Sequence, residues 1–441
     1  KDIDFVYSEG KILGGIIKNK EDFSKVRVLL NNSGFFSYFF NEVSFSGMLT
    51  VNGVSCETTT VKSEDLELYD LITITSEEGI YFDSITRSVS GGIPIYEGSI
   101  EVIKVDNGLV AINVLPLESY LKKVVPSEMP STYNIEALKS QAVSARTYAI
   151  KQIKNQIYQK YGAMIDDSTS SQVYNNIDTQ ESTNKAVDET LGEVLVFDNE
   201  VISTNFFSTS SGFTTNSGDV WGNSATLAFP TETPEYLEGK SLLTEKINID
   251  FNNEEDVLNF YKNKKVKAID DNVSWFRWET SLSFVDIENN INSFVKDRMD
   301  IVPYLFESDF DFNSGTFTGI KSIEVLSRGT NGVVHSILIK NDTNYLKVHS
   351  EYNIRKILAP INNTLTCADG STLDKYTILP SGFFAFESNE SSIFIYGGGN
   401  GHGVGLSQNA ANTLGNQGKS YVEILNTFYT NATIKIINDI K

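Results

Sequence analysis

Cysteine, histidine and long apolar runs are scarce in this sequence of 441 residues, and each scarcity excludes a class of protein. Two cysteines, Cys56 and Cys367, cannot build a disulfide scaffold or a zinc ribbon; we expect two free thiols, with one long-range bridge as the alternative. The histidines His335, His349 and His402 are dispersed and show no ligand spacing, so we expect no metal and no cofactor. No run approaches the roughly 20 apolar residues of a membrane span.

Basic residues are also in deficit, with 36 Lys and Arg against 57 Asp and Glu and a net charge of -21. Such a charge repels phosphate backbones, so nucleic acid is not an expected partner. The length and the 40% of apolar residues predict a globular protein of two or three structural units. Because the chain begins with Lys1 rather than Met, we expect that an export signal or anchor has been removed.

The first half of the chain predicts strands followed by two helices. Short strands punctuated by Gly and Asn turns are expected at 26–30, 72–75 and 100–105. A first helix begins after Pro116 and is expected to end at Pro126, and a second begins after the N-cap Asn134 and carries small and apolar residues at helical spacing up to Ile153. Glu128 is therefore expected just beyond the end of the first helix.

Strands return in the second half, which also contains an acidic segment. They are expected at 192–197, 201–207, 320–326 and 333–340, and a short helix that Gly415 stops follows a glycine-rich run. We expect an α+β fold, with a helical pair that carries Glu128 packed on antiparallel strands and with appended β-rich or α/β subdomains. The expected division is a β-rich segment 1–95, a core 96–228, an acidic insertion 229–318 and a second part of the core 319–441.

Glu128 is the leading candidate for chemistry. It lies in Val125-Pro126-Ser127-Glu128-Met129-Pro130, where two prolines restrict the backbone and fix the position of a carboxylate. A partly desolvated carboxyl group in such a place can donate a proton to a glycosidic oxygen. The local sequence leaves a second interpretation open, in which Glu128 is a solvated residue at a helix end.

Two other positions carry alternatives. Arg146 and Tyr148 lie among small residues on the second helix, and Arg146 is either a structural ion-pair partner or a group that orients Glu128 or a substrate. His402, in Gly401-His402-Gly403, either binds a ligand that approaches the backbone closely or belongs to a structural turn. Neither a phosphate loop, a dinucleotide fingerprint nor a nucleophile elbow is present, which argues against nucleotide binding and a serine triad.

Several strings together resemble the SpoIID/LytB family of wall-associated proteins. They are Tyr96-Glu97-Gly98-Ser99-Ile100-Glu101-Val102, Asn113-Val114-Leu115-Pro116-Leu117-Glu118-Ser119-Tyr120-Leu121, Val125–Pro130, Ala137–Ala149, Gln172-Val173-Tyr174, Phe206–Gly212 with Val220-Trp221, Gly401–Gln408 and Gly418–Leu425, and they occur in the order of the family. The sequence departs from it at Asp166–Ser171, where some members hold zinc through Cys and His, at Ser211, where the family commonly has Gly, and in the long acidic segment.

The resemblance implies a peptidoglycan lytic transglycosylase in which Glu128 is the catalytic acid and base. The substrate-binding residues expected on the same ground are Arg146, Tyr148, Gln172, Ser208, Thr209, Ser210, Ser211, Gly212, His402, Ser407 and Gln408. The expected partners are peptidoglycan glycan strands and a wall amidase or other sporulation or cell-wall proteins, and the expected location is extracytoplasmic. Two rivals remain: a noncatalytic enhancer of an N-acetylmuramoyl-L-alanine amidase, and a hydrolytic muramidase that pairs Glu128 with a second acid such as Asp219.

Overall fold

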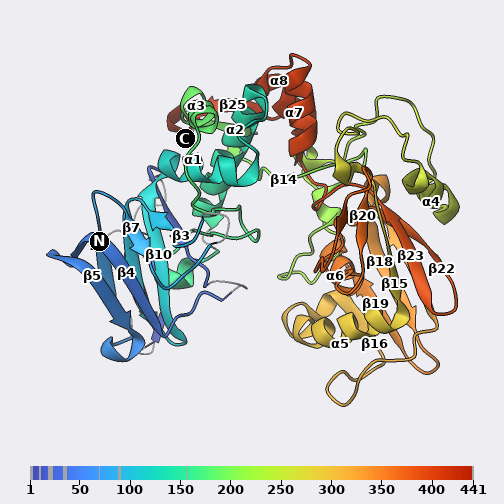
Figure 1. Ribbon diagram of the computed structural model, residues 1–441, viewed down its shortest axis with the longest axis horizontal. Helices are drawn as coiled ribbons and strands as arrows, with labels where there is room; N and C mark the ends of the chain where they lie inside the picture. Colours follow the sequence, from blue (N-terminus) through green and yellow to red (C-terminus); the bar gives the residue numbers. More distant parts are fainter. Residues whose placement is uncertain are drawn as a thin grey trace. The chain divides into compact units, whose positions relative to one another are not determined.

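The computed structural model describes residues 3–8, 11–17, 23–32, 37–68, 70–87, 91–155 and 157–439. They form two compact units, Lys1–Thr204 with Thr433–Lys441 and Asn205–Ala432. Helices and strands are mixed in both units (Figure 1), as the expected α+β class requires. Among the described residues no helix has the length and apolar character needed to cross a membrane.

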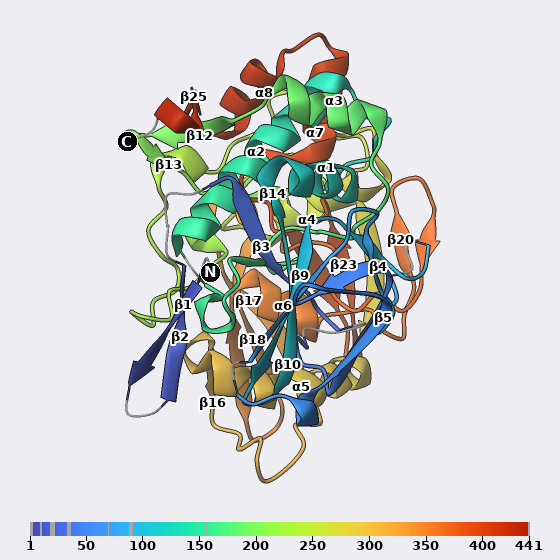
Figure 2. The same ribbon diagram turned by 90° about the vertical axis from the view of Figure 1, so that its left-hand side faces the viewer.

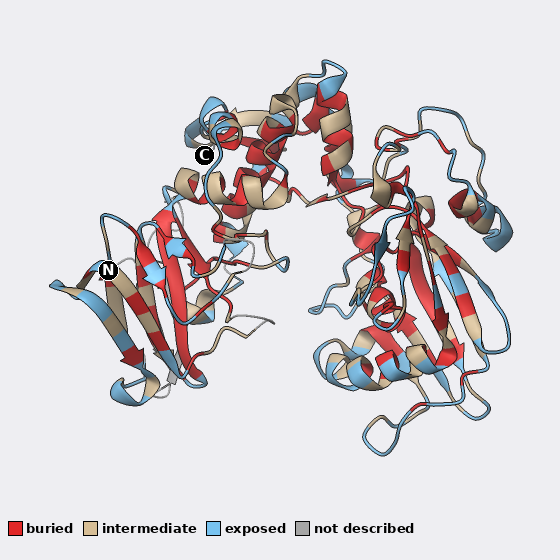
Figure 3. Cartoon of the chain, in the orientation of Figure 1, coloured by how far each residue is buried: buried red, intermediate tan, exposed pale blue. Residues whose placement is uncertain are grey.

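A nine-stranded sheet dominates the first unit, in the order β11-β3-β10-β9-β6-β4-β7-β8, with β5 paired to β4. Its strands are β3 (Lys25–Leu29), β4 (Glu42–Val51), β5 (Val54–Lys62), β6 (Leu71–Thr75), β7 (Ile80–Phe82), β8 (Ile95–Tyr96), β9 (Ser99–Val105), β10 (Gly108–Pro116) and β11 (Ile165–Asp166). Strand β10 is buried along its whole length except at Pro116 (Figure 3), because β3 and β9 flank it. The strands expected at 26–30, 72–75 and 100–105 are confirmed as β3, β6 and β9.

Three helices lie at one end of this sheet (Figures 1 and 2): α1 (Leu117–Glu128), α2 (Ile135–Asn155) and α3 (Glu181–Glu189). Helix α1 follows β10 directly, and α2 begins where the Asn134 side chain accepts a hydrogen bond from the Glu136 N–H at 2.9 Å. Buried small residues of α2, among them Ser140, Ala142 and Ser144, permit close packing against α1, α3 and β12. The unit is completed by β1 (Ile3–Ser8), β2 (Lys11–Ile17), β12 (Glu193–Phe197), β13 (Glu200–Val201) and β25 (Thr433–Ile436).

The expected stop of α1 at Pro126 is wrong, because the helix continues to Glu128. A proline inside a helix removes one N–H donor, but the last turn has other bonds. The Met129 N–H donates to the Val125 carbonyl at 2.9 Å, and the Ser127 hydroxyl donates to the Lys123 carbonyl at 2.7 Å. Glu128 is therefore the last residue of α1 and not a residue of the following turn.

The second unit contains two main sheets and a shared apolar core. The five-stranded sheet is β21-β20-β15-β23-β22 and the four-stranded sheet is β16-β19-β18-β17. The elements are β14 (Phe206–Phe207), α4 (Glu254–Lys262), β15 (Trp278–Ser283), α5 (Phe284–Ile301), β16 (Phe306–Ser308), β17 (Ser322–Arg328), β18 (Val334–Lys340), β19 (Tyr345–His349), α6 (Glu351–Ile357), β20 (Leu365–Cys367), β21 (Thr372–Leu373), β22 (Phe384–Ser388), β23 (Ser392–Gly397), β24 (Leu406–Ser407), α7 (Gln408–Asn416) and α8 (Tyr421–Phe428).

The boundaries expected at 228/229 and 318/319 fall inside this second unit. Strand β15 pairs with β20 and β23, which come much later in the sequence. One core joins Trp278 and Ile287 to Ile337, Ile354 and Ile393. The acidic segment therefore folds together with the residues that follow it.

The stretch 201–207 is not the single strand that the sequence predicted. It divides into β13, which pairs with β12, and β14, which pairs with β24. Between them the Thr204 hydroxyl donates to the Ser144 carbonyl at 2.7 Å. Helix α7 similarly passes Gly415 and ends at Asn416.

Candidate functional site

Glu128 is half-buried at the C-terminal end of α1. Its Oε1 accepts a hydrogen bond from the Val173 N–H at 2.7 Å. The neighbouring Met129 is fully buried. The hydrogen bond from the Val173 N–H is therefore one contact that fixes the carboxylate in place.

The segment 172–176 that supplies this donor is itself tied to the sheet and the helices. Gln172 is buried and its Nε2 donates to the Tyr120 hydroxyl at 3.1 Å and to the Ala145 carbonyl at 3.3 Å. The Tyr174 hydroxyl donates to Asn113 Oδ1 on β10 at 2.9 Å. Because these side chains are buried, the position of the Val173 N–H is fixed by the core of the unit.

Two phenols lie within electrostatic reach of Glu128. Burial, followed by the charges of Asp166 and Glu128, raises the pKa of the half-buried Tyr148. Burial also raises the pKa of Tyr120, to which the charge of Glu128 makes a small contribution. Both phenols therefore stay neutral, and Tyr148 can act as a hydrogen-bond donor beside the carboxylate.

Arg146 is fully buried in the middle of the three helices. Its Nε and Nη2 donate to the two carboxylate oxygens of Glu118 at 2.8 and 2.7 Å. It also donates to the carbonyls of Val187 and Glu193, both at 3.2 Å. This is the structural ion pair that the sequence left open. Because Glu118 lies on α1, the pair anchors the helix that ends in Glu128.

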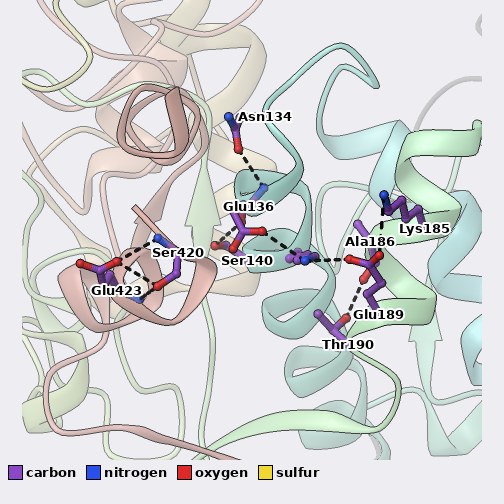
Figure 4. Close-up of polar contacts among 10 residues, drawn as sticks. Asn134, Glu136, Ser140, Lys185, Ala186, Glu189, Thr190, Ser420 and Glu423 are labelled. Atoms are coloured by element: carbon purple, nitrogen blue, oxygen red, sulfur yellow. Dashed lines mark hydrogen bonds and ion pairs between the residues drawn. The ribbon is translucent and has the colours of Figure 1, made fainter. Parts of the chain in front are cut away.

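The helices α2 and α3 carry a second, more exposed ion-pair group (Figure 4). The Lys139 Nζ lies 3.1 Å from a Glu136 oxygen on its own helix and 2.7 Å from a Glu189 oxygen on α3. Because Glu189 is largely exposed, this group contributes less to stability than the buried Arg146 pair.

The serine-rich loop 208–212 belongs to the second unit, where a buried carboxylate organises it. Asp270 accepts hydrogen bonds from the Ser210 N–H at 2.7 Å and the Ser210 hydroxyl at 2.6 Å, and from the Ser407 hydroxyl at 2.8 Å. Burial raises the pKa of Asp270 despite these bonds. Arg277 donates to the Ser211 carbonyl at 3.0 Å, so the loop 208–212 and the start of α7 are joined by residues of the acidic segment.

The remaining predicted residues of the second unit are close to this loop. The Ser208 carbonyl accepts a hydrogen bond from the Asn409 N–H at 3.0 Å. Thr209 and Asn400 are joined by two backbone hydrogen bonds. Gly212 has φ of +103°, a conformation that favours glycine. Gln408 is buried at the first turn of α7.

His402 is a half-buried, neutral imidazole. Its Nδ1 accepts a hydrogen bond from the Val404 N–H at 3.1 Å, and its ring lies 5.0 Å from that of Trp221 and 5.6 Å from that of Phe207, centre to centre. Burial, with a contribution from the charge of Arg355, lowers the pKa of His402 to about 3. The residue therefore acts at neutral pH as a hydrogen-bonding aromatic group and not as a cation.

The predicted site residues thus divide between the two units. Glu128, Tyr148 and Gln172 gather in the first unit, with Arg146 in the helices behind them, whereas Ser208–Gly212, His402, Ser407 and Gln408 gather in the second. The sequence did not indicate Glu118 or Asp270 as the partners that hold two of these groups. Glu118 lies within a string that carries the resemblance and could have been paired with Arg146, but Asp270 lies in a segment without a motif.

Asp219, the second acid of the hydrolase alternative, is held within the second unit. Its Oδ2 accepts a hydrogen bond from the Thr330 N–H at 2.7 Å, and its Oδ1 lies 3.1 Å from His335 Nε2. Burial raises the pKa of Asp219, but the hydrogen bonds from His335 and Thr330 outweigh burial and lower this pKa overall.

Both cysteines are free thiols. Across the described part of the chain, no three His, Cys, Asp or Glu side chains are grouped to hold a metal ion.

Comparison with known proteins finds a family model that matches part of each unit. Residues 105–197 match the model of the SpoIID family, described as Stage II sporulation protein. Residues 219–405 match a domain of unknown function, DUF8618. Glu128, Arg146, Tyr148 and Gln172 all lie in the first matched segment, and His402 lies in the second.

Three curated relatives share sequence with this chain. An amidase enhancer of Bacillus subtilis is 29% identical over 320 residues, which are 71% of this chain and 40% of that protein. An uncharacterized protein of Brachyspira hyodysenteriae is 29% identical over 359 residues, 81% of this chain and 77% of that protein. Stage II sporulation protein D of Bacillus subtilis is 35% identical over 125 residues, 25% of this chain and 36% of that protein. The similarity to the SpoIID family is thus shown for residues 105–197.

Proposed function

We propose that this chain acts outside the cytoplasm on the glycan strands of a bacterial cell wall, as a lytic transglycosylase that uses Glu128. The observation that carries the proposal is the position of Glu128, half-buried at the end of α1 with its Oε1 bound to the Val173 N–H at 2.7 Å, inside the segment that matches the SpoIID family.

A single carboxyl group suffices for this reaction. Protonated Glu128 donates its proton to the oxygen that links N-acetylmuramic acid to N-acetylglucosamine, and the glycosidic C–O bond breaks. The resulting carboxylate then takes the proton of the muramyl C6 hydroxyl, whose oxygen bonds to C1 to give a 1,6-anhydro sugar. Glu128 returns to its protonated form and no water is consumed.

Other residues would contribute binding and orientation. The Tyr148 phenol, which burial keeps neutral, would donate a hydrogen bond to the substrate. In the second unit the half-buried His402 ring and Ser208 hydroxyl would contact sugar groups, whereas the buried Ser210 hydroxyl holds the loop on Asp270. In this proposal Arg146 is a positioning residue, because its guanidinium bonds to Glu118 and backbone carbonyls.

The test is to incubate the protein and its Glu128→Gln variant with intact and peptide-stripped glycan strands and to identify released fragments by mass spectrometry. We expect anhydro-ended fragments from the parent and a loss of at least about 100-fold in the variant, since positioned acid–base groups contribute ~10²–10⁴ in rate. Glu136→Gln, a neighbouring exchange on α2, is the matched control and should retain activity. Faster cleavage of stripped strands would place the enzyme after an amidase.

The second candidate function is that of a noncatalytic wall-binding enhancer of an amidase, favoured by the relative named amidase enhancer. In that case the parent and Glu128→Gln would bind glycan equally, release nothing and stimulate an added amidase to the same extent. The hydrolase alternative predicts reducing-end fragments that Asp219→Asn abolishes, whereas the transglycosylase should largely tolerate that exchange.

A further inference from the structure

Trp221 is the most exposed of the three tryptophans, with 40% of its surface accessible to water. Trp278 is only 2% exposed and donates its Nε1–H to the Gly399 carbonyl at 2.9 Å. Trp275 is half-buried and packs against the same core. Contacts within the second unit therefore account for Trp275 and Trp278, whereas much of Trp221 is left in water, which is unfavourable for so large an apolar side chain.

The backbone holds Trp221 in a fixed position. Its N–H donates to the Ser217 carbonyl at 3.1 Å, and its carbonyl accepts a hydrogen bond from the Thr231 hydroxyl at 3.1 Å. The carbonyl of the preceding Val220 accepts a hydrogen bond from the hydroxyl of the buried Ser350 at 2.9 Å. An aromatic side chain on a fixed backbone loses little conformational entropy when it binds a ligand.

The imidazole of His402 lies beside this indole. The centres of the two rings are 5.0 Å apart, and the Phe207 ring lies 5.6 Å from the imidazole. Hydrogen bonds to the backbone of Val404 and of Phe206 fix the orientation of the imidazole. Because burial lowers the pKa of His402 to about 3, this ring carries no charge at pH 7. Trp221 and His402 thus form a fixed and uncharged aromatic surface, which we call the aromatic platform.

Polar residues border the aromatic platform. Two backbone hydrogen bonds, of 3.1 and 2.8 Å, join Thr209 to Asn400 and bring the serine-rich loop to the platform. Gly401 permits this close approach, because its φ is +111° and a Cβ at this position would lie 2.7 Å from the Phe207 Cβ. Ser208 and Asn400 are half-buried. An aromatic surface with a polar border suits a ligand that has an apolar face and a polar edge.

We propose that the aromatic platform binds an N-acetylated sugar ring of the glycan strand, with the indole of Trp221 stacked on one face of that ring. A β-linked pyranose ring of this kind carries its hydroxyl and acetamide groups around the edge and exposes C–H groups on its faces. Stacking of such a face on the indole removes apolar surface of both partners from water. The source of the sugar rests on the proposed function.

The experiment measures binding of the N-acetylglucosamine hexamer to the full chain carrying Glu128→Gln, which separates binding from cleavage. Titration calorimetry gives the affinity, and tryptophan fluorescence reports on the surroundings of the indole rings. In the same background, Trp221→Ala removes the stacking ring and Trp221→Tyr keeps an aromatic ring. Phe394→Ala is the matched control, because Phe394 is an aromatic residue of the same unit that is 42% exposed and lies on β23, outside the platform.

We expect the hexamer to bind the Glu128→Gln chain and to change its fluorescence. Trp221→Ala should weaken binding at least about tenfold, a difference of ~1.4 kcal/mol, and Trp221→Tyr should stay within about threefold of the starting affinity. Phe394→Ala should not change the affinity. Binding to the Trp221→Tyr variant should leave the fluorescence almost unchanged, because the contact remains while the reporting indole is gone.

Three results would each overturn the proposal: no binding of the hexamer, an unchanged affinity in Trp221→Ala, or an equal loss of affinity in Phe394→Ala. The proposed function can fail independently. If the chain with Glu128 intact cleaves no glycan but Trp221-dependent binding is retained, the transglycosylase is refuted and the sugar site stands.

Discussion

The ion pair between Arg146 and Glu118 offers a test of what Arg146 does. The Arg146 side chain is fully buried, while the Glu118 side chain retains 27% of its exposure. Glu118→Gln keeps the shape of the partner and removes its charge, so the guanidinium would remain buried with only carbonyl and hydroxyl acceptors. A buried charge without its counter-ion is strongly unfavourable.

The expected cost is about 2–4 kcal/mol of the stability of the first unit. Breaking a buried pair by removal of one partner typically costs ~3–5 kcal/mol. We expect a cost below that typical range because Arg146 keeps its hydrogen bonds to the Val187 and Glu193 carbonyls and because Glu118 is partly exposed. Lys139→Gln, which removes the cation that lies between Glu136 and the exposed Glu189, should cost less than about 1 kcal/mol.

Hydrogen exchange followed by mass spectrometry is the suitable assay, because it reports each unit separately. We expect faster exchange in α1, α2 and α3 of Glu118→Gln and unchanged exchange in α5 and β15, which serve as an internal reference. If α1–α3 exchange at the parent rate while glycan binding falls, Arg146 contacts the substrate and its structural assignment is wrong.

The remaining predictions concern the second unit. The pKa of His402 is about 3 in the folded chain against an ordinary value of 6.5, so the stability that its neutral form contributes is complete above pH 6.5 and is lost as the pH falls toward 3. Chemical unfolding measured between pH 7 and pH 4 should show this loss of stability, about 2–4 kcal/mol for a half-buried ring. The variant His402→Asn should lose less stability over the same pH range. Identical pH profiles of the parent and the variant would contradict the burial of the imidazole. Asp270→Asn should destabilise the unit by about 1–3 kcal/mol, because one amide oxygen cannot accept all the donors from Ser210 and Ser407. Unfolding of the variant at the parent's urea midpoint would refute that reasoning.

Local sequence was sufficient for the helix that follows Glu128 in the chain. The small and apolar residues of α2 recur at helical spacing, and Asn134 supplies the cap, so both the helix and its start could be predicted. The strings of the SpoIID resemblance extend from Tyr96 to Leu425, and the family model matches residues 105–197 of that stretch. Helical periodicity and capping depend on neighbours a few residues away, which is why they can be read from the chain.

Tertiary structure decided what depends on distant partners. Pro126 would end an isolated helix, but α1 continues because Ser127 and Met129 find acceptors one turn back and Val173 meets Glu128. The acidic segment 229–318 has no periodic signal that reveals its pairing, and only the folded chain brings β15 between β20 and β23 and Asp270 under Ser210. The sequence alone thus determined helix α2 with its start and nominated Glu128 as the candidate acid. The end of α1 and the partners that fix these residues were decided by packing in the folded chain, which no local pattern encodes.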